Sequence, residues 1–542
     1  MWRKLVSSIA YPPWAQAQGR FVRLDALDRF LDGTIYDHLE FSFYDEQDAG
    51  GNYVPIQSRR PSAQLNLPNM VAKMLARKLF AGRHAPRLTH DRPEVAAWLR
   101  DVVARGALYE RMLQACVWGS VGSVAATFRL VDDGLHVDIW RAKYCYPTFA
   151  PDGALEKLSV QYTVGGRELR TRGFSVDRSG EEISVHRNYW FVRDWTRSEE
   201  LTYIPVAQEI YNPYEGALTP EGTLVVDDSR TVVHKLDFVP GVWMVNLAGG
   251  SAPDGVCTWE AAVDLSLDAD YTLSQIGRGV RYNAAPQLVI VGDLKGDDEN
   301  NSMIQRGPVT VLQFPSSART EDGASRGNGD AKLLEMVGNG TQAGMKYVEY
   351  TRRLALEAIS VSRKNPEEAR GTLSGRAMEL MDDSFFDLVH ELRSAYGEEG
   401  FGALLRKIAV ALVVTGRAPP DVSVQDVRAF GMRWPRLYGA TPQDEVTLIE
   451  GMSMATQNNL IDADTAKSYL WAHLDLEDYK TDTPIGSSGA QEPLDQPTPG
   501  DATDAGADVY NEGTNTDIRR PGPQNTTLPA RHVGRPQTKL NP

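Results

Sequence analysis

The amino-acid sequence predicts an α+β fold, because its hydrophobic pattern changes period twice along the chain. Apolar residues recur at helical spacing up to about residue 120, alternate one by one between residues 124 and 245, and return to helical spacing from Trp259. Helices on both sides of a block of alternating strands are typical of α+β proteins with an antiparallel sheet. A chain of 542 residues is also longer than one hydrophobic core usually serves, so we expect several domains.

The N-terminal region is expected to form three helices, at residues 69–80, 93–103 and 108–118. Pro93 suits a first helical turn, where its missing N–H leaves no bond unmade. The sheet block then opens with a hairpin, whose strands at residues 125–131 and 135–140 flank a turn signal ending in Gly134. Further strands are expected at residues 157–164, 182–192, 202–211, 224–226 and 243–245.

Two long helices are expected in the second half of the chain, at residues 259–282 and 342–362. Between them the sequence predicts two short strands, at residues 287–291 and 308–314, followed by a loop at residues 316–330 that is rich in glycine, serine and charge.

A break follows the second long helix, because Pro366 and two glycines oppose a helix between Arg363 and Arg376. A third helix opens near Ser374, is bent or interrupted at Gly397 and Gly400, and resumes at residues 401–414.

The last folded part is expected to hold a strand at residues 422–434 that returns to the sheet, and two short helices within residues 442–479. From about residue 481 to 542 the composition shifts to Pro, Gly, Thr, Asp and Gln. Such a segment has too little apolar surface to fold alone, so we expect it to be disordered.

The composition argues against a protein that grips nucleic acid. Hydrophobic residues make up 42% of the chain, enough for a sizeable core, but the net charge is −15, whereas phosphate binding needs clustered Lys and Arg. Cys116, Cys145 and Cys257 fit neither a disulfide framework nor a zinc motif, so we expect buried, reduced thiols. We find no signal peptide and no membrane-spanning run, and expect a soluble protein made inside the cell.

No catalytic constellation rises above background. His390-Glu391 lacks a second histidine four residues on, no glycine-rich loop ends in Gly-Lys-Ser or Gly-Lys-Thr, and Ser374 has the wrong offset for a nucleophile elbow. We interpret the paired aspartates, such as Asp382-Asp383, as solvated carboxylates rather than metal ligands. The tryptophans between Trp190 and Trp195, and Trp243, favour core or subunit packing over a stacking platform.

The order of three segments along the chain is nevertheless informative about the family. They are Leu236-Asp237-Phe238-Val239-Pro240-Gly241-Val242-Trp243 before the first long helix, Leu373-Ser374-Gly375-Arg376-Ala377 after the broken loop, and Asn459-Leu460-Ile461-Asp462-Ala463-Asp464-Thr465-Ala466 near the end of the folded part. With the two long helices, this order over roughly Asp25 to Tyr479 resembles the portal (head–tail connector) proteins of tailed bacteriophages.

The resemblance implies a portal-type subunit with an antiparallel sheet wing, long stem helices, a small α/β clip and a helical crown. Its implied parts are N-terminal helices and wing at 1–257, a first stem helix at 258–283, a clip at 284–340, a second stem helix at 341–362, a tunnel loop at 363–376, a wing-crossing helix and return strand at 377–440, crown helices at 441–479 and a disordered tail at 480–542.

The resemblance further implies a non-catalytic protein without cofactor or metal. Such subunits form a ring, usually of twelve, at one capsid vertex, through which double-stranded DNA is packaged and ejected. Its partners would be the terminase large subunit, a head-completion or adaptor protein, and the major capsid and scaffold proteins, with no membrane involved. Its place would be the virion, after assembly in the host cytoplasm.

The loop cations Arg363, Lys364, Arg370 and Arg376 would then face the DNA and make few, sequence-independent phosphate contacts. A second interpretation stands beside this one: the same cations pair with Glu367 and Glu368 or cap helix ends. For the whole chain, the alternatives are another virion component, such as an adaptor or shell protein, and a hydrolase that uses carboxylates on the sheet.

Overall fold

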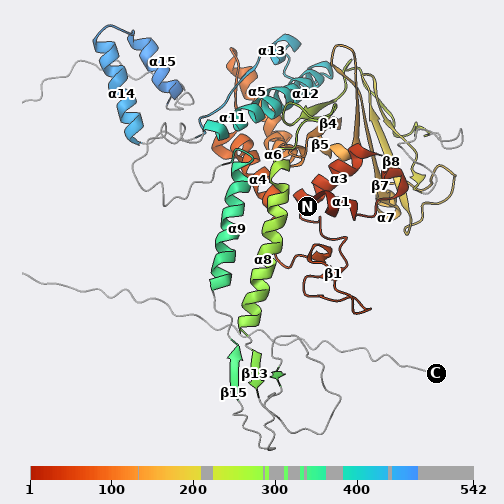
Figure 1. Ribbon diagram of the computed structural model, residues 1–542. Helices are drawn as coiled ribbons and strands as arrows, with labels where there is room; N and C mark the ends of the chain where they lie inside the picture. The colour runs from red at the N-terminus through yellow and green to blue at the C-terminus, as the bar shows by residue number, and fades with distance from the viewer. Residues whose placement is uncertain are drawn as a thin grey trace, which may run out of the picture. The chain divides into compact units, whose positions relative to one another are not determined.

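The computed structural model describes residues 2–16, 18–131, 134–208, 224–284, 287–291, 311–314, 330–334, 339–361, 383–437 and 442–473. Within these ranges the chain is an α+β protein, as the sequence predicts, and Figure 1 shows its elements in order. The loop from Arg363 to Arg376 and the tail predicted at 480–542 lie outside the described residues.

All three N-terminal helices predicted from the sequence are confirmed, as α4 (Leu67–Phe80), α5 (Pro93–Arg105) and α6 (Leu108–Gly119). Asn66 caps α4 by accepting a hydrogen bond from the Asn69 N–H through its side chain. A further helix that the sequence analysis did not specify, α3 (Gly19–Asp32), buries Leu24, Leu27 and Leu31. These helices share one large core with the later helices described below.

The predicted sheet block is in fact two sheets. The hairpin of β4 (Ser123–Val131) and β5 (Gly134–Arg141) pairs with β12 (Gly241–Val245) in the order β12-β4-β5. The second sheet has the order β11-β9-β8-β7-β6, with β10 also paired to β8. Its strands are β6 (Cys145–Phe149), β7 (Leu155–Gly165), β8 (Asn188–Trp195), β9 (Glu199–Thr202), β10 (Val206–Ala207) and β11 (Val232–Val233).

Three of the predicted strands were wrong in extent. The strand expected at 182–192 begins only at Asn188, because the chain turns between Ser184 and Arg187. The strand expected at 202–211 is divided between the end of β9 and the short β10, and its residues 209–211 lie outside the described residues. The strand expected at 224–226 is an isolated bridge between Tyr203 and Val226. Local alternation does not reveal such turns, so the lengths were overestimated.

The two long helices are present and lie side by side, as Figure 1 shows. They are α8 (Val263–Ala284), entered through a 3₁₀ turn at Glu260–Ala262, and α9 (Asn339–Glu357). Gly344 of α9 lies so close to Ile276 of α8 that an added Cβ would be 2.9 Å from its side chain. The helix expected to reach residue 362 ends at Glu357, and Ser360 shortly after it takes a left-handed conformation with φ 56°.

The chain between these helices contains a three-stranded sheet with the order β14-β13-β15. The strands β13 (Gln287–Val291) and β14 (Val311–Phe314) were predicted, and they pair in parallel. The strand β15 (Asp330–Leu334), antiparallel to β13, was missed. Its sequence, Asp-Ala-Lys-Leu-Leu, does not alternate, so pairing with β13 rather than local pattern accounts for it.

The third predicted helix is interrupted where its glycines indicated. Its expected beginning near Ser374 lies outside the described residues; from Asp383 on it consists of α11 (Asp383–Leu392), a π-helical stretch at Arg393–Gly402, and α12 (Ala403–Val414). An added Cβ on Gly397 would lie 2.2 Å from the Trp434 ring, and one on Gly400 would lie 2.7 Å from Met244 Sδ. The glycines thus allow β12 and the chain near Trp434 to approach the wider π-helix closely.

The strand predicted at 422–434 is wrong for most of its length. Ser423 and Asp426 form a reciprocal capping box that starts α13 (Val424–Arg428), and only β16 (Gly431–Arg433) is a strand. It pairs with β3 (Arg87–Thr89) beside the N-terminal helices instead of joining either larger sheet. The two last helices, α14 (Pro442–Gln457) and α15 (Ala463–His473), form as predicted.

Buried side chains bear out two further predictions. Cys116, Cys145 and Cys257 are free and buried, and Trp190 and Trp195 lie in the core. In the part of the chain that the structure describes, no helix combines the length and hydrophobicity needed to cross a membrane.

Gly119 offers a test of the packing between α6 and the π-helix, because a Cβ there would lie 2.2 Å from the Tyr396 hydroxyl. We predict that Gly119→Ala lowers the free energy of unfolding by about 1–3 kcal/mol through overpacking. The matched control, Gly277→Ala inside α8, meets nothing within 4 Å and should raise it by about 0.5–1 kcal/mol. Denaturant unfolding measures both changes, and equal effects at the two sites would contradict the described contact.

Candidate functional site

The four cations predicted to face DNA, Arg363, Lys364, Arg370 and Arg376, lie outside the described residues. The structure therefore describes the elements on either side of that loop: α9, with Val361 buried shortly after it, and α11, which begins at Asp383. The candidate site that can be built from contacts is the helix pair α8 and α9 together with the residues that hold it.

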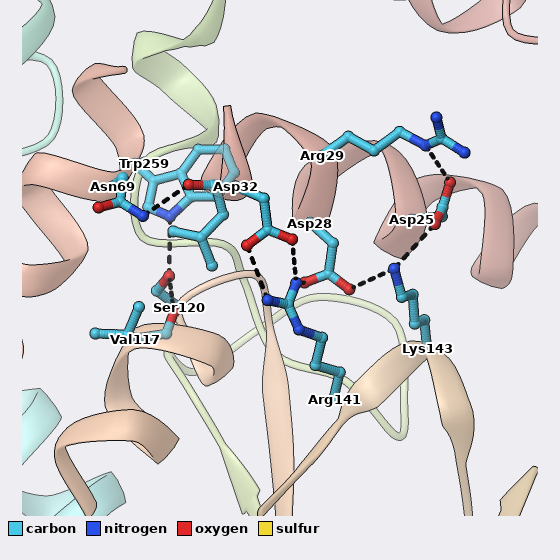
Figure 2. Close-up of polar contacts among 11 residues, drawn as sticks. Asp25, Asp28, Arg29, Asp32, Asn69, Val117, Ser120, Arg141, Lys143 and Trp259 are labelled. Atoms are coloured by element: carbon cyan, nitrogen blue, oxygen red, sulfur yellow. Dashed lines mark hydrogen bonds and ion pairs between the residues drawn. The ribbon is translucent and has the colours of Figure 1, made fainter. Parts of the chain in front are cut away.

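The beginning of α8 is fixed by a buried hydrogen-bond network. The Asn246 amide donates to the Val256 carbonyl at 2.7 Å and to the Thr258 hydroxyl at 2.8 Å, while its oxygen accepts from the Tyr396 hydroxyl at 3.0 Å. Next to it, the fully buried Trp259 indole donates to the Ser120 hydroxyl at 3.0 Å, as Figure 2 shows. The network joins β12, α6 and the π-helix to the residues from which α8 starts.

One flank of α8 is covered by the chain between Tyr36 and Leu65. The buried Asp270 carboxylate accepts from the Tyr36 hydroxyl at 2.9 Å and from the Leu65 N–H at 2.7 Å. The Tyr271 hydroxyl donates to the carbonyls of Gln57 and Arg59, and Arg278 pairs with Glu46 nearer the end of the helix. This flank of α8 is therefore a packed, hydrogen-bonded surface within the subunit.

The helix α9 packs on α8 along one side, and large side chains around the rest of the helix are exposed. Val348, Thr351 and Ala355 are buried, and the Tyr347 hydroxyl donates to Asp268 of α8 at 2.9 Å. The side chains of Met345, Tyr347 and Tyr350 are nevertheless 54%, 50% and 50% exposed. Three large exposed apolar or aromatic residues within six positions are more than a single helix usually shows to water, so the surface of α9 outside its contact with α8 is a candidate subunit interface.

A charge cluster ties α3 to the end of β5, and Figure 2 shows its members. Asp25, Asp28 and Asp32 lie on one face of α3 and pair with two cations, Arg141 and Lys143, at distances of 2.8 to 3.2 Å. Arg29 adds a third cation, 2.7 Å from Asp25. The three acids and three bases balance, so the cluster joins elements and leaves no free carboxylate pair for hydrolysis.

The pKa values in this cluster follow from burial and pairing. Burial raises the pKa of the Asp28 carboxyl, against the effect of Lys143 and Arg141. Burial alone would raise that of Asp25 too, but Lys143 and Arg29 lower its pKa overall. For Lys143, the attraction of Asp28 and its neighbours outweighs burial and raises the pKa. The shifts of Asp25 and Lys143 favour the charged forms that ion pairs need, whereas the shift of Asp28 reflects its burial.

Residues 236–243, one of the three segments on which the family resemblance rests, are held against α12 by Lys407. Its ammonium donates to the carbonyl of Gly241 at 2.7 Å and to that of Val239 at 3.3 Å. Burial lowers the pKa of Lys407 to about 8. The lysine thus fixes the path of the chain just before β12, which ends next to Asn246.

Sequence reasoning missed both the charge cluster and the Asn246 network. A signal for the first was present, since Asp25, Asp28 and Asp32 recur at helical spacing beside the apolar Leu24, Leu27 and Leu31. Acids at the edge of a buried face predict buried partners. No local signal marks Asn246 or Tyr396, because the two residues are 150 positions apart in the sequence and come together only in the folded protein.

Among the residues with described positions, no group of His, Cys, Asp or Glu is arranged to hold a metal ion. No known family model matches the chain, and no curated protein matches it. Function must therefore be argued from the elements themselves.

Asp270 predicts a pH dependence of stability. Burial raises its pKa from 3.8 to about 6, so the folded state binds this proton more tightly than the unfolded state does. Its contribution to stability is therefore greatest below about pH 4 and is lost as the pH rises through 6. We predict that Asp270→Asn stabilises the protein at pH 7.5 by up to about 3 kcal/mol, but much less at pH 4.5. Denaturant unfolding at both pH values tests this, and equal effects would contradict it.

Proposed function

We propose that the chain is the portal subunit of a tailed bacteriophage, a non-catalytic protein that assembles into a ring around double-stranded DNA. The observation that carries the proposal is the antiparallel pair of α8 and α9, firmly anchored at the start of α8, with a small sheet of β13, β14 and β15 inserted between the two helices. This supports the order of parts that the family resemblance implies.

In this proposal the two larger sheets form the wing, α8 and α9 the stem, and β13 to β15 the clip. The interrupted helix α11–α12 crosses the wing, α14 and α15 belong to the crown, and residues 363–376 are the tunnel loop. The clip would present the surface for the terminase large subunit and for head-completion proteins. The capsid and scaffold proteins would surround the wing.

The exposed face of α9 suits a ring. A closed ring of identical subunits uses head-to-tail contacts, in which one face of a subunit meets a different face of its neighbour. One side of α9 is occupied by α8, whereas Met345, Tyr347 and Tyr350 are about half exposed around the rest of the helix, with the Tyr347 hydroxyl still reaching Asp268 of α8. Aromatic residues and methionine are enriched at the centre of such interfaces.

The charge of the chain also suits a conduit. A net charge of −15 repels DNA on average, so a duplex would slide past the subunit without sticking. In the proposal, Arg363, Lys364, Arg370 and Arg376 are a local exception that touches phosphates. Since these contacts are few and electrostatic, they would be sensitive to salt and indifferent to sequence.

Electron microscopy of the purified full-length chain tests the proposal directly. We expect rings with a central channel, about twelve subunits in most, in negative stain. Class averages that contain only monomers or small compact oligomers under every assembly condition would refute it.

The interface on α9 gives a second prediction. Met345→Glu and Tyr350→Glu should each abolish ring formation, because they place a charge where a neighbouring subunit packs. The melting temperature of the subunit should hardly change, since both side chains are about half exposed. Val185→Glu, at a 43% exposed position on the wing, is the matched control and should leave rings intact. Size-exclusion chromatography with light scattering measures the outcome, and rings in both α9 variants would rule out this face.

The loop gives a third prediction, for phage production complemented with variant subunits. Replacing Arg363, Lys364 and Arg370 together with Ala should preserve rings and reduce the yield of packaged DNA. Replacing Glu367 and Glu368 with Ala separates the two roles of the cations. If the cations touch DNA, loss of the acids leaves packaging intact; if they pair with the acids, both sets of variants behave alike.

A further inference from the structure

A pocket of about 540 Å³ lies where the two larger sheets meet. Its lining comes from β4 and β5 of one sheet, from β7, β8, β9 and β11 of the other, and from the chain after α7 (Gly166–Thr171). Four of the lining residues are arginines and four are aromatic: Arg129, Arg172, Arg193, Arg230, Trp140, Tyr162, Phe174 and Phe191. Neither the charge cluster on α3 nor the helix pair contributes to it.

The aromatic residues form a continuous row. Ring centroids of Trp140 and Tyr162 are 6.0 Å apart, those of Tyr162 and Phe191 5.5 Å, and those of Phe191 and Phe174 5.9 Å. The row runs from one sheet to the other and gives the pocket a broad apolar wall.

Guanidinium groups lie on this wall and are held in place by it. Arg172 lies 5.1 Å from the centre of the Phe191 ring, and Arg230 lies 4.0 Å from that of Phe174. Arg172 also donates to the Tyr162 hydroxyl at 2.7 Å, and Arg230 donates to the Gly173 carbonyl. A guanidinium fixed in this way loses little freedom when it binds an oxyanion.

The lining carries an excess of positive charge. Its carboxylates are Asp138, 3.5 Å from Arg129, and Glu200, which pairs with Arg193. Arg172 and Arg230 pair with Glu168 and Asp227, neither of which lines the pocket. Inside the pocket itself, four guanidiniums therefore face two carboxylates, in a chain whose overall charge is −15.

Two donors on these arginines have no acceptor within the described protein. The Nε atoms of both Arg129 and Arg193 are buried and make no hydrogen bond. Burying an N–H without an acceptor is costly, and more so when it belongs to a cation. These atoms are closed off from the pocket, so an oxyanion there would meet the exposed parts of the four guanidiniums, two of which have their partner carboxylates outside the lining.

We propose that this pocket binds a small phosphate monoester with a flat aromatic body, the class to which nucleoside monophosphates belong. The phosphate would lie against the guanidiniums, which match its oxygens in geometry and charge. The aromatic body would lie against Trp140, whose indole N–H is already satisfied by Thr127. Because the pocket is larger than a bare phosphate needs, the proposed ligand includes an aromatic group that fills the remaining space.

Titration of the full-length protein with dAMP, inorganic phosphate and deoxyadenosine tests the proposal. Binding is measured by calorimetry and by the change in tryptophan fluorescence. We expect dAMP to bind at least tenfold more tightly than either of its two parts, and the affinity to fall as salt is added. The fluorescence change on binding should disappear in Trp140→Phe. No binding of dAMP at millimolar concentration, or equal binding of phosphate and dAMP, would overturn the proposal.

Variants identify the pocket as the site. Arg129→Met and Arg172→Met should each weaken dAMP binding tenfold or more, while thermal unfolding shows that the subunit remains folded. Arg105→Met is the matched control, because this exposed arginine on α5 pairs with Asp101 and neither residue lines the pocket. Loss of binding in the control, or none in the two pocket variants, would place the ligand elsewhere. Ring formation is measured separately, so either proposal can fail while the other stands.

Discussion

The amide side chain of Asn246 joins three parts of the chain that lie far apart in sequence. It stands at the end of β12, holds the chain at Val256 and Thr258 just before α8, and accepts the hydroxyl of Tyr396 from the π-helix. Asn246, Thr258 and Tyr396 are buried and Val256 is partly buried, so each hydrogen bond replaces one that water would otherwise supply. The direction in which α8 leaves the core depends on this junction, because Trp259 and Ser120 lie directly beside it.

The same junction explains the glycines around it. Gly119 lets Tyr396 approach α6, and Gly400 lets Met244 of β12 approach the π-helix. A π-helix is wider than an α-helix, and here it brings Tyr396 and Gly400 onto the side that faces β12. The helix pair is thus supported by the core at one end and by the chain from Tyr36 to Leu65 along its flank, while the outer face of α9 stays accessible. A firmly held helix pair with an uncovered surface is suited to an assembly of identical subunits.

Local pattern predicted much of the fold, and long-range contacts account for most of what it missed. The helices α4, α5, α6 and α8 and the hairpin of β4 and β5 were predictable, because burial on one face imposes a regular period on each. The division into two sheets, the strand β15 and the pairing of β16 with β3 depend on partners distant in sequence. The capping box at Ser423 and Asp426 could have been recognised in the sequence, but residues 422–434 were interpreted as a strand instead.

The functional prediction divides in the same way. The cations of the loop from Arg363 to Arg376 could be identified from the sequence, because proline and glycine mark the end of the helix before them. Which groups they contact depends on the assembled protein. The pocket between the sheets was not predictable, since Arg129, Arg172, Arg193 and Arg230 are spread over about 100 residues and meet only when both sheets form. Spacing along the chain carries no information about such convergence.

The junction at Asn246 makes α8 part of the core rather than an independent arm. Hydrogen exchange of the full-length protein, followed by mass spectrometry, measures this most directly. The slowest amides of Val263–Tyr271 should open with the same free energy as those of β12 and α6, and Asn246→Ala should lower all three by a similar amount. Exchange in α8 that is faster from the start, or unchanged by the substitution, would contradict the account.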